Sequence, residues 1–176
     1  MIINSNLLRA ALVCVAKKDP RYYLCGVHIT SNYLEATNGH VALRLEHGIS
    51  TRRKAIVQFH GKIPKKAETT ELHFTKEPYA VHRDITGMRV GFSALTLLDG
   101  RFPDLDRVIP KKVESVIPHF QAEYLAYPYK MFEGDSVFIA VSMYPSSMTD
   151  ACLMKFSDNI NQRYGNPQLI VMPCRV

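Results

Sequence analysis

The stretch "YYLCGVHITSNYLEATNGHVALRLE", Tyr22 to Glu46, decides the fold class, because from Tyr22 onward its apolar residues recur with a period of two. In its last six residues Val41, Leu43 and Leu45 share one face, and the residues between them share the other. Ser-Asn and Asn-Gly pairs separate the alternating runs and are typical of tight hairpin turns. The stretch therefore predicts an antiparallel meander.

A single amphipathic helix is predicted before this meander. Leu8, Ala11, Leu12 and Val15 follow the i, i+3, i+4, i+7 spacing of one helix face. The preceding "NSN" supplies residues that can cap the helix, which we expect to end by Lys18, just ahead of a proline.

Short alternating runs continue through the rest of the chain. We expect strands in "KAIVQF", "ELHFT", "YAVHR", "MRVGFSAL", "SVFIAVSM", "ACLMKF" and "PQLIVMPCRV". A second helix is predicted in "FQAEYLAYPYKMF", kinked or split by Pro128. The segment "GKIPKKAETT" is too short for much helix, and "YPSSMTD" and "SDNINQRYGNP" are predicted to be mobile loops. The sum predicts an α+β fold of antiparallel sheets with helices on one face.

Composition is that of an ordinary globular protein. The chain has 176 residues, 47% hydrophobic and 22% charged, and no apolar run long enough to span a bilayer. Its N-terminus does not resemble a secretory signal, so we expect a cytoplasmic protein without a membrane partner. Lys and Arg outnumber Asp and Glu by 22 to 16, but in short scattered clusters. That spread is compatible with a polyanionic partner and does not support tight sequence-specific DNA binding.

Motifs of catalysis and cofactor binding are missing from the sequence. It contains no phosphate-binding loop, dinucleotide fingerprint, nucleophile elbow or H-E-x-x-H motif. Four scattered cysteines are predicted to be small buried hydrophobes. Asp104 and Asp106 would point the same way on a strand and could hold Mg²⁺, although a solvated acidic turn is commoner. We expect a non-enzymatic protein without cofactor or metal.

Three blocks, in this order, resemble the bacterial DNA polymerase III beta subunit, the sliding clamp. They are "DPRYYLCGVHITSNYLEATNGHVALRL" (19–45), "DGRFPDLDRVIP" (99–110) and the C-terminal "LIVMPCRV" (169–176). The resemblance implies an abbreviated clamp of α+β, DNA-clamp-like fold, with antiparallel sheets and one or two helices per unit. Residues 1–110 are similar to the middle clamp domain, and 111–176 to the second half of the last domain. Such an abbreviation suggests a phage or mobile-element origin.

The resemblance also implies a hydrophobic cleft that binds short Leu-Phe-rich peptides from polymerases, the clamp loader and repair proteins. Met in such a wall can repack around different ligands. Val41 stands where the family often has Arg, and Cys174 and Val176 are smaller than the usual Met and Leu, so peptide preference is expected to differ. The matching positions are Leu24, Thr37, Gly39, His40, Val41, Ala42, Pro110, Ile170, Met172, Pro173, Cys174, Arg175 and Val176.

A second implied property is sequence-independent contact with duplex DNA. The loop "KKDPRYY" is similar to a DNA-facing loop of the family, and the implied contacts are Arg9, Lys17, Lys18, Arg21, Tyr22 and Tyr23. The function expected from the resemblance is that of a processivity factor which encircles duplex DNA and tethers polymerase or other replication and repair proteins. About three copies would complete a six-domain ring, giving a homo-oligomer.

Two alternatives stay open at this level. Residues 1–60 and 118–176 could form one domain interrupted by an insertion, which would require more copies or no ring. The chain could also be a non-encircling adaptor or decoy that binds clamp-binding peptides and modulates the host replication machinery. Mass in solution discriminates between these functions.

Overall fold

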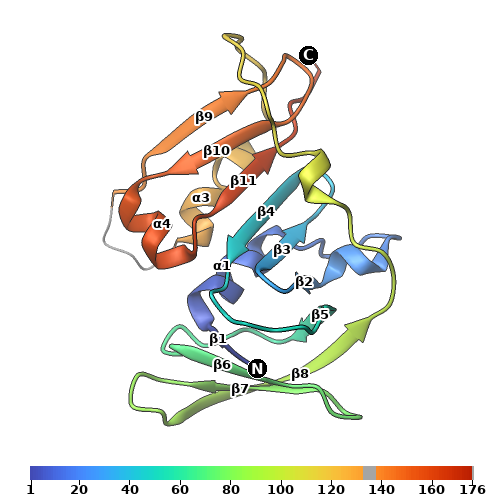
Figure 1. Ribbon diagram of the computed structural model, residues 1–176, viewed down its shortest axis with the longest axis vertical. Helices are drawn as coiled ribbons and strands as arrows, with labels where there is room; N and C mark the ends of the chain where they lie inside the picture. Colours follow the sequence, from blue (N-terminus) through green and yellow to red (C-terminus); the bar gives the residue numbers. More distant parts are fainter. Residues whose placement is uncertain (133–137, 176) are drawn as a thin grey trace.

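One antiparallel sheet organises the molecule (Figure 1). The computed structural model describes residues 1–132 and 138–175. Within them, eleven strands are hydrogen-bonded in the order β1-β6-β7-β8-β5-β2-β3-β4-β11-β10-β9, with antiparallel neighbours throughout. Strands β4 and β11, far apart in the sequence, therefore lie side by side.

The elements are mostly short strands, with the α-helices near the two ends of the chain. The strands are β1 (Ile2–Asn4), β2 (Val27–Ile29), β3 (Tyr33–Thr37), β4 (Val41–Glu46), β5 (Ala55–His60), β6 (Thr69–His73), β7 (Tyr79–Arg83), β8 (Arg89–Leu98), β9 (Val141–Pro145), β10 (Cys152–Phe156) and β11 (Gln168–Val171). The α-helices are α1 (Ser5–Cys14), α2 (Ala122–Leu125), α3 (Tyr127–Met131) and α4 (Asp158–Tyr164). Two 3₁₀ helices, η1 (Tyr22–Cys25) and η2 (Leu105–Arg107), lie in the connections.

Helix α1 forms where its spacing predicts. The Asn4 side chain caps it by accepting a hydrogen bond from the Asn6 backbone N–H at 2.8 Å. Its buried face includes Leu8 and Ala11, and the helix also packs against α3, where Cys14 Sγ lies 3.7 Å from Met131 Sδ. The N-terminal helix and the C-terminal segment thus share one interface.

Most predicted strands are present, and the predicted α+β, clamp-like fold class is confirmed. The second helix is split, as predicted, into α2 and α3; the break falls at Ala126, and Pro128 lies in the first turn of α3. No helix of the described residues is long and apolar enough to cross a membrane.

Two local predictions are wrong. The meander starts at Val27, because residues 22–25 coil into η1, which puts Leu24 into the interior. The predicted loop after β10 contains α4, whose Ile160 and Tyr164 are buried one turn apart. Gly165 ends this helix in the left-handed conformation, at φ 62°. That pattern of two apolar residues followed by Gly is a readable helix signal.

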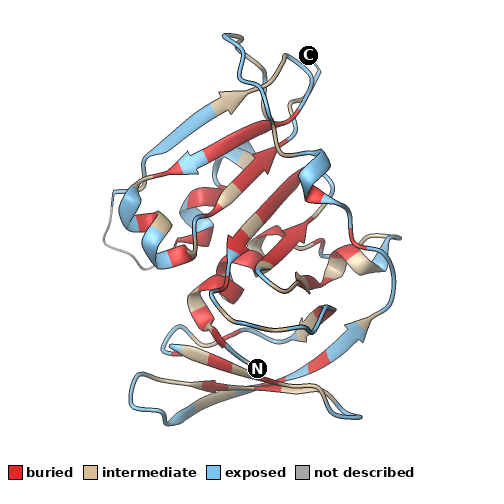
Figure 2. Ribbon diagram, viewed as in Figure 1, coloured by how far each residue is buried: buried red, intermediate tan, exposed pale blue. Residues whose placement is uncertain are grey.

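The largest hydrophobic cluster draws on both ends of the chain. It joins residues of α1 and β2–β4, such as Leu8 and Leu43, to Phe132, Met154 and Tyr164 of the C-terminal segment. Figure 2 shows this burial running along the central strands, whereas the connector before α2 is mostly exposed. The boundary between units 1–110 and 111–176 stays a prediction, since sheet and core run through both.

Candidate functional site

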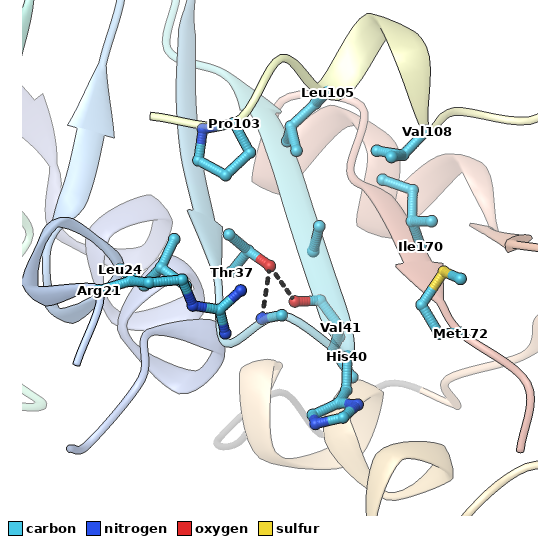
Figure 3. A pocket seen from close by; sticks show the side chains of 12 residues that line it. Arg21, Leu24, Thr37, His40, Val41, Pro103, Leu105, Val108, Ile170 and Met172 are labelled. Carbon is cyan, nitrogen blue, oxygen red and sulfur yellow. Dashed lines mark hydrogen bonds between the residues drawn. The ribbon is translucent and has the colours of Figure 1, made fainter. Parts of the chain in front are cut away.

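A cavity of about 200 Å³ opens where the β3–β4 hairpin, the end of β11 and the connector after β8 meet (Figure 3). It combines segments from three widely separated parts of the sequence. Its lining residues are Arg21, Leu24, Thr37, Gly39, His40, Val41, Ala42, Pro103, Leu105, Val108, Ile170 and Met172.

The hairpin turn forms a fixed wall of this cavity. Thr37 Oγ1 donates to the Val41 carbonyl at 2.7 Å and accepts from the Gly39 N–H at 3.0 Å (Figure 3). The Asn38 side chain accepts from the backbone N–H groups of His40 and Val41. These local bonds satisfy the turn internally, as Asn side chains do in Asx turns, so the turn presents a preformed surface.

The end of β11 forms the opposite wall. Ile170 pairs with Ala42 in the β4–β11 ladder, and the Met172 N–H donates to the His40 carbonyl at 2.9 Å. Leu24 and Ile170 are buried beneath the cavity in one apolar cluster, whereas Met172 is 38% exposed. This side of the cavity therefore combines a buried apolar floor with the partly exposed, flexible thioether of Met172.

The connector supplies the third wall through Pro103, Leu105 and Val108. Asp104 caps η2 by accepting from the Asp106 N–H at 3.1 Å. Leu105 is 2% exposed and packs into the apolar cluster below, while Val108 is 40% exposed. The connector is therefore anchored by one side chain and leaves another facing the opening.

A cation stands at the cavity mouth. Arg21 Nε and Nη2 donate to the two carboxylate oxygens of Asp19 at 3.0 and 2.9 Å, and this hydrogen bonding lowers the pKa of Asp19 to about 2. A Cβ on Gly39, at φ +90°, would lie 2.8 Å from Arg21 Nη2. Glycine at position 39 thus leaves room for the guanidinium over the turn.

Eight of the thirteen residues predicted for the peptide cleft line this cavity. They are Leu24, Thr37, Gly39, His40, Val41, Ala42, Ile170 and Met172.

Four of the remaining five do not line this cavity. Pro110, Pro173, Cys174 and Arg175 are not among the lining residues, and Val176 lies outside the described residues. The Cys174 N–H instead donates to the His119 carbonyl at 2.8 Å, which directs the chain end toward that segment. The connector contributes through residues 103–108 rather than Pro110, because η2 turns Leu105 inward.

The residues predicted to contact DNA are not gathered at one place. Arg9 donates to the backbone carbonyls of Pro64 and Ala67 at 2.8 and 3.0 Å, so it ties α1 to the 64–67 loop. Lys17 and Lys18 are exposed and line a second cavity, of about 810 Å³, together with Lys130 of α3.

The two tyrosines and Arg21 do not line this second cavity. Tyr22 is exposed, Tyr23 packs against the apolar cluster below the first cavity, and Arg21 lines that cavity. A DNA contact stays a prediction for each of the six predicted residues.

The acidic pair in the connector has partners of its own. Asp106 accepts from Arg44 Nη1 at 2.6 Å, and Asp104 Oδ2 lies 3.4 Å from Arg107 Nε. Within residues 1–132 and 138–175, no group of three or more His, Cys, Asp or Glu side chains could hold a metal ion.

Fold and cavity together define the class: the chain has the fold of the bacterial DNA polymerase III sliding clamps, as the sequence blocks predicted. Three solved structures similar to it are the DNA polymerase III beta chain of Streptococcus pneumoniae TIGR4, the DNA polymerase III subunit beta of Pseudomonas aeruginosa, and a sliding clamp from Bartonella birtlesii bound to griselimycin. Their TM-score is 0.64, and sequence identity is 16%, 16% and 15%.

The match to these clamps covers all of this chain. It covers 64%, 66% and 66% of theirs, so the chain spans about two thirds of the length of each. No protein-family model matches the sequence, and a search of the curated proteins found no match.

Proposed function

We propose that this protein is a clamp-like tethering factor whose cavity binds a short hydrophobic peptide of a replication or repair protein. The observation that supports this proposal most is that the hairpin turn, the connector and the end of β11 converge around one apolar cavity. The clamp fold supports the same proposal, because sliding clamps are non-enzymatic processivity factors.

The chemistry of the walls suits a Leu-Phe-rich peptide. Leu24, Leu105 and Ile170 form a buried apolar floor, and burying one aliphatic or aromatic side chain there would contribute roughly 1.5–3 kcal/mol. Met172 can repack around the shape of the ligand. The Arg21 guanidinium at the mouth is suited to a carbonyl or carboxylate of the bound segment.

Titration of a fluorescent Leu-Phe-containing peptide tests this proposal. We expect Met172→Ala to weaken binding about ten- to a hundred-fold. Deletion of residues 172–176 should abolish binding. Met148→Ala is the matched control, because Met148 is 46% exposed and does not line the cavity. Absence of binding to the unaltered protein, or equal affinity for all variants, would remove the proposal.

The tethering role further requires contact with duplex DNA. We propose Lys17, Lys18 and Arg21 as weak phosphate contacts whose affinity falls steeply with salt. Retention on DNA is measured at two salt concentrations for the unaltered protein and a triple charge-reversal variant. If the variant is retained on DNA as well as the unaltered protein, these residues form only a solvated basic surface.

Assembly decides between encircling and non-encircling modes. A ring of about three copies follows from the predicted two-unit chain and six-domain rings. The alternative, a non-encircling adaptor or decoy that modulates the host machinery, is favoured by the short span of the chain, 64–66% of the clamps it resembles. Light scattering with and without circular DNA separates them, since a monomer at high micromolar concentration excludes the ring.

A further inference from the structure

A row of three polar side chains crosses the β2-β3-β4 meander beneath the connector. His28 stands directly opposite Glu35, and Glu35 directly opposite Arg44, in the strand registers. His28 Nδ1 lies 2.9 Å from Glu35 Oε2, and Arg44 Nη2 lies 2.7 Å from Glu35 Oε1. The Glu35 side chain is only 6% exposed, so its two oxygens are held by one neighbour each.

The two outer residues of this row, His28 and Arg44, both contact the connector. The His28 ring stacks on Phe102 with centroids 4.7 Å apart and planes 26° apart. Arg44 Nη1 donates to Asp106 Oδ1 at 2.6 Å, and this bond lowers the pKa of the Asp106 carboxyl. The two anchored residues flank Pro103 and Leu105 of the cavity wall, and Val108 follows two residues later.

Stability alone does not explain a row of paired charges at this place in the sheet. A buried carboxylate is costly unless paired, and a buried ion pair is often no more stabilising than a well-packed apolar substitute. What such a network adds is defined geometry, because each bond fixes one side chain against another. None of His28, Glu35, Arg44 and Asp106 lines the cavity, so any effect on a ligand must pass through the connector.

We infer that the row formed by His28, Glu35 and Arg44 is a positioning device that sets the affinity of the cavity by fixing connector residues 102–108 as its wall. This inference rests on the proposed peptide binding. Arg44 is its main positioning residue, because it joins the buried Glu35 to Asp106 on the outer side of η2. When the connector is displaced, the cavity loses a wall. The apparent affinity for peptide therefore falls in proportion to the fraction of molecules in which the connector stays in place.

Asp106→Ala tests the inference with little risk to folding, since the Asp106 side chain is 77% exposed. We expect peptide affinity to fall about two- to five-fold, the range of partly exposed ion pairs. Asp106→Glu should restore most of it. In an Arg44→Gln background, Asp106→Ala should add nothing further, because the partner is already gone.

Two controls on the same connector isolate the row. Arg107→Ala truncates the adjacent side chain, and Asp104→Asn removes an equal charge while keeping an oxygen to cap η2. Arg107 and Asp104 pair with each other across η2. Both controls should bind peptide as the unaltered protein does. Equal affinity of Asp106→Ala and the two controls would overturn the inference.

A second readout separates this inference from the proposed function. In peptide-free protein, the amides of Val108 and Ile109 donate to the Leu105 carbonyl, and their hydrogen exchange reports the connector directly. Exchange should accelerate in Asp106→Ala and not in the controls. If the unaltered protein binds no peptide, the proposed function fails, while unchanged exchange in Asp106→Ala would independently overturn the positioning role.

Discussion

Replacing Gly165 with Ala should weaken the contact between the C-terminal segment and the end of β4. Gly165 caps α4 in the left-handed conformation, and its carbonyl accepts from the Glu46 N–H at 2.7 Å. An added Cβ would lie 1.9 Å from the Glu46 carbonyl oxygen, against 3.4 Å for ordinary contact. The backbones must therefore separate by about 1.5 Å, the difference of those distances, and Ile170 and Met172 follow shortly after this joint.

The magnitude follows from two costs. The left-handed conformation costs an Ala roughly 1–2 kcal/mol. Loss of the Glu46 hydrogen bond and of nearby packing adds about 1–2 kcal/mol. We expect the free energy of unfolding to fall by about 3 kcal/mol, a large share of the roughly 5–15 kcal/mol typical of a domain.

Gly48→Ala is the matched control. Gly48 has φ +66°, close to the +62° of Gly165, and nothing lies within 4 Å of its would-be Cβ. It should show the conformational cost alone, about 1–2 kcal/mol. Urea unfolding followed by circular dichroism measures both variants. Equal losses for the two would refute the argument that the Gly165–Glu46 contact holds the C-terminal segment in place.

Three further predictions concern titration and reactivity. The Asp19 carboxyl, with its pKa lowered to about 2 by hydrogen bonding to Arg21, should stay ionised in an NMR titration until pH approaches 2; Arg21→Gln should return the pKa toward its ordinary value. Burial lowers the pKa of His82, and the nearby charge of Arg9 lowers it further, so the unfolded chain binds this proton more readily than the folded chain. The stability contributed by neutral His82 should therefore be present at neutral pH and decline as pH falls below about 6.5. Urea unfolding at several pH values should show a smaller decline in His82→Gln. Burial raises the thiol pKa of Cys14 and Cys152, so a thiol reagent should modify only the half-buried Cys25 and Cys174 until urea is added.

Local alternation and turn chemistry allowed much of the sheet to be predicted. The β3–β4 hairpin is one example, although its register pairs Glu35 with Arg44 and so centres the turn on Gly39 and His40, whereas a two-residue Asn38-Gly39 turn would have set Glu35 opposite Ala42. The register between β4 and β11 was not readable in this way, because it depends on tertiary packing. Family resemblance alone suggested that Ile170 and Met172 would join the hairpin.

The connector shows where sequence reasoning stops. Its acidic residues suggested a solvated turn or a weak metal site, whereas the structure uses Asp104 as a cap and Asp106 as the partner of Arg44. Leu105 faces inward only because a 3₁₀ turn replaces extended chain at that point. A one-residue difference in a short turn moves a side chain from solvent to core, and no periodicity marks it.

Hydrogen exchange with and without a bound Leu-Phe-containing peptide tests whether the cavity binds the peptide. We expect new protection at the hairpin turn 38–42, at Val108 and Ile109, and at Met172, whose N–H already donates to the His40 carbonyl. The exposed face that carries Phe92 should be unaffected. Protection on that face, or none at the cavity under saturating peptide, would contradict the claim that this cavity is the tethering site.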